Sequence, residues 1–342
     1  MSRKFAVVGA GVVGLTTAVQ LQQMYPSASV TIIADKFMKE TTSIGAAGIF
    51  HPRPMAISNP SFDINDLWFY SWAYFHALAH SEDSAEAGCH IICGYEYYDT
   101  KEDVDFRRKN MYAFDEIASE TEMNMFPGPQ FKFGYRATSI LTSPVRYLPY
   151  LTKLISSNGG QFVKRKLNTL EELVGSYDIV VNCTGLGARE LVGDSKMYSS
   201  RGQIIKVVAP WIKTYLYAED KEGNATYVYP VTDFVVVGGI RQSNDECLQP
   251  RDADRDAIWQ RATQIVPSLK RAHIIGDWVG LRPKRDSLRL EAKVLNYSTG
   301  FVKVVHNYGH GSEGIGLSWG TAKKAVSLVR GMLNENKLMS KM

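Results

Sequence analysis

Residues 9–14 (GAGVVG) have the composition and spacing of a turn that cradles phosphate. Gly9 would allow a tight turn, Gly11 a close approach of the backbone to a pyrophosphate, and Gly14 close packing of the helix that follows. The N–H groups at the start of that helix would face the ligand. Asp35, which lies 21 positions after Gly14, could accept hydrogen bonds from a ribose hydroxyl.

The alternatives at these positions are a glycine turn without a ligand and, for Asp35, a solvated acid in a turn. The flanking pattern favours nucleotide binding, because a short apolar run at 5–8 precedes the motif and a helical apolar pattern follows it as far as Tyr25. The motif alone does not distinguish FAD from NAD.

A second glycine-rich segment lies at residues 306–316 (HNYGHGSEGIG). Four glycines within eight residues would let the backbone approach a flat ring, and the helix that follows would direct its partial positive charge at that ring. A reduced flavin carries negative charge and would be stabilised by such a helix end. The alternative is a simple strand-to-helix turn.

Other catalytic or metal chemistry has no visible pattern in the sequence. The Ser, Cys and His residues form no nucleophile–base pair, and the Asp, Glu and His residues have no metal-ligand spacing. The four cysteines, Cys89, Cys93, Cys183 and Cys247, include no CxxC pair. We therefore expect reduced structural thiols in an intracellular protein, and no metal site.

The composition is that of an ordinary globular chain of 342 residues, 45% hydrophobic and 22% charged. A net charge of +4 suits an anionic ligand but is too small and scattered for nucleic-acid binding. No apolar run approaches 18 residues and the first apolar stretch is too short for a signal peptide, so we expect no membrane partner. No pattern indicates an oligomeric state.

The last three residues, Ser340-Lys341-Met342, are similar to the peroxisomal SKL signal with Met in place of Leu. We expect a peroxisomal location through the import receptor, and otherwise a cytoplasmic one. The alternative is a lysine-rich frayed terminus.

The elements that would position these residues alternate between strands and helices. Apolar and alternating runs predict strands at residues 5–8, 30–33, 131–136, 162–167, 177–181, 203–208, 226–240 and 301–306. Helical patterns predict helices after the first glycine motif and at residues 63–80, 145–157 and 316–333. The helix at 63–80 is so dense in aromatic residues that we expect it to be buried on two sides or to lie at an interface.

These motifs resemble the D-amino acid oxidase family, and more closely its D-aspartate oxidase branch, over nearly the whole chain. The matching segments are VVGAGVVGL at 7–15, TTSIGAAG at 41–48, NCTG at 182–185, RGQ at 201–203, TYVYP at 226–230, GGIRQ at 238–242, GLRPKRDSLRLE at 280–291 and HNYGHGSEGIG at 306–316. The combination of GLRPxR with HxYGHGxxG is the most specific part, since NCTG and GGxxQ also occur in related flavoproteins.

The resemblance implies an α/β fold in which a Rossmann-like FAD-binding domain is interleaved with an α+β substrate domain built on a mostly antiparallel sheet. We expect the FAD-binding domain at residues 1–55, 140–190 and 280–342, and the substrate-binding domain at 56–139 and 191–279. The positions that match FAD contacts in the family are Gly9, Gly11, Val12, Val13, Gly14, Asp35, Lys36, Thr41, Thr42, Ser43, Gly48, Ile49, Leu167, Gly311, Gly314, Ile315 and Gly316.

The family reaction is oxidative deamination of a D-amino acid by dioxygen: a hydride leaves the alpha carbon for flavin N5, and the products are a 2-oxo acid, ammonia and hydrogen peroxide. By the resemblance, Tyr227, Arg282 and the backbone carbonyl of Ser312 contact the substrate, although the family often has Gly at the last position. Arg282 offers a planar two-pronged donor suited to the alpha carboxylate. The alternatives are a surface arginine in a Pro-flanked turn for Arg282 and strand packing for Tyr227. The reaction needs no acid or base, so we interpret His310 as structural.

Arg241 favours an acidic substrate, D-aspartate or D-glutamate. The acidic-substrate branch has arginine at this position, and a buried guanidinium would need the anionic partner that a side-chain carboxylate supplies. The alternative is an exposed arginine at the end of a strand. A second arginine that this branch often carries is not evident, because Tyr217 occupies its place. His51 and Arg53 are candidate substitutes, with a solvated loop as the alternative for each. The competing functions are an oxidase of neutral D-amino acids, an NAD-dependent dehydrogenase and a flavoprotein without activity.

Overall fold

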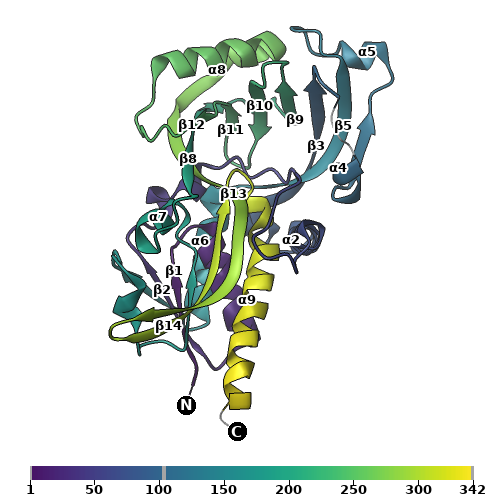
Figure 1. The fold of residues 1–342 in the computed structure, drawn as a ribbon. Coiled ribbons are helices and arrows are strands. Elements are labelled where there is room, and N and C mark those ends of the chain that lie inside the picture. The colour runs from purple at the N-terminus through teal and green to yellow at the C-terminus, as the bar shows by residue number, and fades with distance from the viewer. Residues whose placement is uncertain (1, 102–104, 340–342) are drawn as a thin grey trace.

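The computed structural model describes residues 2–101 and 105–339, which form two lobes joined by one continuous sheet (Figure 1). The strands follow the order β4-β5-β3-β9-β10-β11-β8-β13-β14-β7-β1-β2-β6, and β12 pairs with β8 outside this path. The Ser340-Lys341-Met342 tripeptide lies outside the described residues. Within the described ranges, no helix has both the length and the hydrophobicity that a membrane span requires.

The lobe that holds both chain ends is built on a parallel sheet. Its strands in spatial order are β14 (Gly300–His310), β7 (Ile179–Asn182), β1 (Lys4–Val8), β2 (Ser29–Ala34) and β6 (Gln161–Lys164). In the central strand β1, Phe5 and Val7 belong to one apolar core, and Ala6 and Val8 belong to the core on the opposite face. The period of two therefore buries both faces of this strand, as is typical of a parallel sheet covered on both sides.

Four helices fill the larger of these two cores. They are α1 (Val12–Met24), α2 (Ile64–Ala79), α6 (Pro144–Ser157) and α9 (Gly314–Met339). Helix α2 runs beside α9 (Figure 1), and the approach is so close that a Cβ on Gly320 would lie 2.0 Å from the carbonyl oxygen of Leu67. Trp68 and Phe75 of α2 are buried, whereas Phe69 is 62% exposed, so the helix keeps one exposed side despite its many aromatic residues.

The second lobe is mostly antiparallel, with one parallel pair between β3 and β9. Its strands are β3 (Cys89–Tyr98), β4 (Ala113–Glu116), β5 (Phe133–Thr142), β8 (Tyr198–Val208), β9 (Tyr215–Glu219), β10 (Ala225–Pro230), β11 (Val235–Gly238) and β12 (Gln242–Ser243). Helix α8 (Asp252–Ile265) packs over β8, β10 and β11.

Short helical segments connect these elements. They are η1 (Met38–Glu40), η2 (Thr42–Gly45), α3 (Ser84–Ala87), α4 (Asp105–Lys109), α5 (Glu120–Met123), η3 (Leu170–Leu173), η4 (Gly185–Gly187), α7 (Ala188–Leu191) and η5 (Pro267–Arg271).

The strand β13 (His273–Tyr297) joins the two lobes. Its first half pairs with β8 from His273 to Lys284, and its second half pairs with β14 from Lys284 to Tyr297, with an irregularity between Lys284 and Arg289. The GLRPKR segment lies where the strand passes from one partner to the other. The Pro-flanked turn considered for Arg282 is therefore part of a long strand, which fixes the position of this residue between the lobes.

The α/β fold with a mostly antiparallel second lobe is confirmed, and the helices predicted at 63–80, 145–157 and 316–333 are present. The predicted strand at 226–240 is instead a hairpin of two strands, because residues 231–234 form the turn between β10 and β11. The proposed division into interleaved domains stays a prediction. Helix α2, which that division places in the substrate domain, packs in the core with α1, α6 and α9.

Candidate active site

A cavity of about 830 Å³ lies between the lobes and is lined by residues from both. Every position predicted to contact FAD or substrate lines it except Gly14, whose predicted role is packing. A Cβ on Gly14 would lie 1.9 Å from the carbonyl oxygen of Gly9, so only glycine lets α1 pack this close to the turn after β1. Gly9 itself has a φ of 108°, which favours glycine.

The start of α1 can receive an anion. Gly11 is the N-cap residue and provides no side-chain cap, and the first turn contains no acidic residue. The N–H of Val12 donates to Ser43 Oγ at 3.0 Å, which ties the helix start to the segment that contains η2. The N–H groups and the partial positive charge of this end suit a pyrophosphate.

Further along the cavity, the residues after β2 and around η2 form the wall predicted to face the ribose and the ring. Asp35 and Lys36 are exposed at the end of β2, and both line the cavity. The remaining predicted FAD contacts of this region in the wall are Thr41, Thr42, Ser43, Gly48, Ile49 and Leu167.

The second glycine-rich segment closes the cavity at the start of α9. Gly309 and Gly311 have φ values of 94° and 58°, conformations that favour glycine. His310 between them is buried, its Nε2 lies 3.0 Å from Thr321 Oγ1, and burial lowers its pKa to about 3. An imidazole with so low a pKa does not act as a general base near pH 7, which agrees with a structural role for His310. Ser312 lines the cavity, with its hydroxyl turned to Glu313 at 2.7 Å.

Arg282 and Tyr227 enter the cavity through spaces that glycines leave open. A Cβ on Gly202 would lie 2.4 Å from both Nη atoms of Arg282, and a Cβ on Gly238 would lie 2.2 Å from the ring of Tyr227. Gly202 belongs to the RGQ segment and Gly238 to the GGIRQ segment, and no role was predicted for either glycine. The signal was present, because a glycine inside a strand often marks a close approach of another group.

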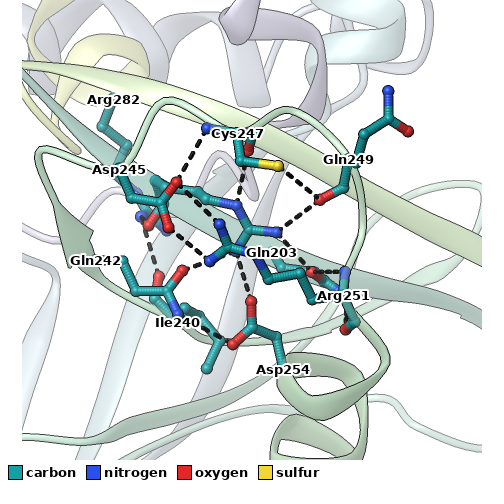
Figure 2. A network of polar contacts seen from close by, with 10 residues as sticks. Gln203, Ile240, Gln242, Asp245, Cys247, Gln249, Arg251, Asp254 and Arg282 are labelled. Atoms are coloured by element: carbon teal, nitrogen blue, oxygen red, sulfur yellow. Dashed lines mark hydrogen bonds and ion pairs between the residues drawn. The ribbon is translucent and has the colours of Figure 1, made fainter.

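Backbone carbonyls hold the guanidinium of Arg282. Its Nη1 donates to the carbonyl oxygen of Ile240 at 3.1 Å and to that of Arg201 at 3.3 Å (Figure 2). No hydrogen bond joins its Nη2 or Nε to any other described residue, so these donors are available to a carboxylate in the cavity. The five donors of a guanidinium allow it to be anchored and to bind an anion at once.

A buried polar network lies behind those carbonyls (Figure 2). The side chain of Arg201 is fully buried and contacts Asp254 at 2.6 Å and Gln242 at 2.8 Å, and its Nε donates to the carbonyl of Cys247 at 2.7 Å. These bonds tie β8 to the loop after β12 and to α8. No role was predicted for Arg201 from the sequence, although it lies in the RGQ segment. It supports the wall that holds Arg282.

Arg241 lines the cavity, but the expectation that it is a buried guanidinium without an anionic partner in the protein is wrong. Its side chain is 40% exposed and its Nη1 lies 3.2 Å from Glu219 Oε2, so a carboxylate of the protein itself is its partner. Its Nη2 donates to Tyr217 OH at 3.0 Å. Arg53 donates to the same hydroxyl at 3.2 Å. His51 is buried and Arg53 is partly buried, so neither belongs to a solvated loop.

Among the described residues, no group of three or more His, Cys, Asp or Glu side chains could hold a metal ion. The cavity combines two glycine-rich turns, the N-terminus of a helix whose first turn has no acidic residue, and several arginines.

Residues 4–328 match the family model described as FAD dependent oxidoreductase. The chain is 40% identical over 330 residues to D-aspartate oxidase of Homo sapiens, and this alignment covers 95% of this chain and 94% of that protein. It is 34% identical over 347 residues to D-aspartate oxidase 1 of Caenorhabditis elegans, covering 99% and 100%. Among solved structures, glycine oxidase from Geobacillus kaustophilus aligns with a TM-score of 0.75 over 96% of this chain and 95% of that one, at 20% identity, which shows a shared fold alone.

Proposed function

Because the chain belongs to the FAD dependent oxidoreductase family, we propose that it is an FAD-dependent oxidase that deaminates acidic D-amino acids, D-aspartate and D-glutamate. The observation that carries this proposal is the placement of Arg241 and Arg282 in the same cavity as both glycine-rich turns. Both relatives reported above are D-aspartate oxidases that it matches over nearly its full length.

The cavity fits FAD. The acid-free start of α1 suits the diphosphate, the turns at Gly9 and Gly311 bring backbone to the cavity surface, and Asp35 is available to a ribose hydroxyl. We assign FAD binding to the predicted residues that line this wall. When bound, FAD supplies the acceptor for the hydride.

Arg282 and Tyr227 would hold the alpha carboxylate of the substrate. No described residue accepts a hydrogen bond from Nη2 or Nε of Arg282, and its anchoring by two carbonyls fixes the direction of the guanidinium. Tyr227 lines the same cavity and could donate from its hydroxyl to the same group. Such fixed orientation of a reacting bond is worth on the order of 7–11 kcal/mol of the barrier.

Arg241 would bind the side-chain carboxylate at the other end of the substrate. With both carboxylates held, only one enantiomer directs its alpha hydrogen at the hydride acceptor. This arrangement would explain selectivity for D-amino acids over L-amino acids. The substrate amine must be uncharged for the hydride to leave, and the neutral His310 takes no part in this step. Water then hydrolyses the imine to a 2-oxo acid and ammonia. Dioxygen accepts the two electrons that left the alpha carbon as hydride, together with two protons, and becomes hydrogen peroxide.

The experiment that tests this function measures peroxide and 2-oxo acid formation with D-aspartate, D-glutamate, D-alanine and L-aspartate. We expect the acidic D-amino acids to have the highest kcat/KM and L-aspartate to give no product. Higher kcat/KM on D-alanine would show a neutral-substrate oxidase instead, and absence of turnover on every D-amino acid would contradict the proposal.

We also propose that Ser340-Lys341-Met342 directs the protein to peroxisomes through the import receptor. The peroxide product is consistent with that location. A fluorescent fusion that ends in this tripeptide should colocalise with a peroxisomal marker, and a fusion that ends in Ser-Lys-Asp should not. Identical distributions of the two would reject the signal.

A further inference from the structure

Arg53 and Arg241 converge on one phenol in the cavity, the hydroxyl of Tyr217. Arg53 lies in the loop between η2 and α2, and its Nη2 donates to Tyr217 OH at 3.2 Å, while Nη2 of Arg241 donates to the same oxygen at 3.0 Å. All three residues line the cavity. We propose that Arg53 is a second guanidinium that binds the side-chain carboxylate of the acidic substrate. This inference rests on the proposed function and deepens it.

Tyr217 sets the spacing of the two guanidinium groups. A phenol has one donor and two lone pairs, and here the O–H donates to Glu219 while the two arginines occupy the lone pairs. Adding the distances of 3.2 and 3.0 Å limits the separation of the two Nη2 atoms to 6.2 Å. A carboxylate whose two oxygens each accept a bond of about 2.8 Å fits within such a gap.

The charges show why Arg241 is not sufficient by itself. Its ion pair with Glu219 at 3.2 Å cancels its formal charge locally. Burial raises the pKa of Tyr217, although Arg53 and Arg241 act in the opposite direction, so we treat the phenol as neutral. The group formed by Arg53, Arg241, Tyr217 and Glu219 therefore carries a formal charge of about +1, and about zero without Arg53. Attraction for a second carboxylate depends on Arg53.

A buried acid positions Arg53 through His51. Glu96 is fully buried, and its Oε2 lies 3.1 Å from His51 Nε2 and 2.6 Å from Arg107 Nη1. Burial alone would favour the protonated acid, but His51 and Arg107 hold the pKa of Glu96 well below its usual range. The resulting carboxylate accepts the Nε2–H of His51, which leaves Nδ1 with a lone pair.

That lone pair faces Arg53. The Nε of Arg53 lies 3.4 Å from His51 Nδ1, a weak hydrogen bond, and the carbonyl of Arg53 accepts from Trp68 Nε1 at 3.1 Å. Burial lowers the pKa of His51 to about 4, against the effect of Glu96, so the ring is neutral and can accept. His51 is therefore a positioning residue that directs the Nη groups of Arg53 into the cavity.

The test compares kcat/KM for D-aspartate and for D-asparagine, which has the same shape without the charge, in the FAD-loaded enzyme. Arg53→Gln should lower the value for D-aspartate roughly 10- to 150-fold, the effect of losing one hydrogen bond to a charged group, and should change that for D-asparagine far less. Arg53→Lys should restore part of the loss. Arg136→Gln, which alters an exposed arginine of β5, is the matched control. It should leave unchanged the ratio of kcat/KM for D-aspartate to kcat/KM for D-asparagine.

An unchanged ratio in Arg53→Gln, or equal losses on both substrates, would overturn the role of Arg53 and leave the proposed function standing. A wild-type enzyme that oxidises neither substrate would instead overturn the proposed function itself. Glu219→Gln keeps the inference testable if Arg53→Gln fails to bind flavin, because loss of this anion should raise the ratio. A ratio that stays the same or falls would overturn it.

His51 is tested by a split between KM and kcat. His51→Leu should raise KM for D-aspartate with little change in kcat, and His51→Asn, whose amide oxygen can replace Nδ1 as acceptor, should restore part of the affinity. An equal fall of kcat on both substrates would show that His51 only supports the fold.

Discussion

Replacing Gly202 with alanine should move the guanidinium of Arg282 without disturbing the rest of the fold. The new Cβ would lie 2.4 Å from Nη1 and Nη2 of Arg282, whereas ordinary contacts begin near 3.4 Å, so the guanidinium must shift by about 1 Å. Gly202 lies within β8 and has no positive φ, so alanine suits the backbone. Because a misplacement of about 1 Å can cost about 100-fold, kcat/KM should fall by about this factor on every D-amino acid.

The assay is peroxide formation with D-aspartate and D-alanine, together with flavin absorbance and Tm of the FAD-loaded protein. Flavin content should stay normal, because Gly202 lies on the side of the cavity that faces Arg282. Gly331→Ala is the matched control, since a Cβ there meets no atom within 4 Å and Gly331 lies in α9. Near-normal kcat/KM in Gly202→Ala would refute the proposal that the guanidinium of Arg282 must be held in this position to bind the alpha carboxylate.

Three further perturbations test other parts of the structure. Arg241→Ala should reduce kcat/KM for D-aspartate far more than for D-alanine, because it also leaves Glu219 unpaired near the substrate; equal losses would contradict its role. Asp254→Ala should lower the free energy of unfolding by about 3–5 kcal/mol in urea titrations, since it leaves Arg201 as an unpaired buried charge. Below pH 6.5 a histidine in the unfolded chain binds a proton, whereas burial lowers the pKa of His310 in the folded protein to about 3. As the pH falls below 6.5, this difference should lower the free energy of unfolding by about 1.4 kcal/mol per pH unit. His310→Gln should remove that part of the slope between pH 6.5 and 4.5, and an unchanged slope would be evidence against it.

The glycine-rich turns could be predicted from the sequence because their requirements are local. Gly14 is required within the six-residue motif itself, because a Cβ there would meet the carbonyl oxygen of Gly9, and Gly9 has a positive φ that favours glycine. A Cβ on Gly9 would also meet the carbonyl oxygen of Cys183, a contact that the motif does not reveal. Arg282 and Tyr227 were predicted through resemblance rather than from spacing. Their physical support, the space left by Gly202 and the carbonyls of Ile240 and Arg201, comes from strands that meet only in the folded sheet.

The arrangement around Tyr217 could not be predicted, because its members are far apart in the chain. Arg53 reaches Tyr217 across 164 positions and Glu219 pairs with Arg241 across 22, so no local pattern reveals either contact. The long strand β13 was also missed. Its mixed polar and apolar residues serve two different partners, so neither a clean alternation nor a continuous apolar run marks its full length.

The most direct test of the central claim is anaerobic mixing of the FAD-loaded protein with D-aspartate or L-aspartate while flavin absorbance is recorded. If two carboxylates are held in one handed orientation beside the hydride acceptor, D-aspartate should bleach the flavin in a saturable reaction and L-aspartate should leave it oxidised. Flavin that stays oxidised with D-aspartate, or that is bleached equally by both enantiomers, would contradict the account.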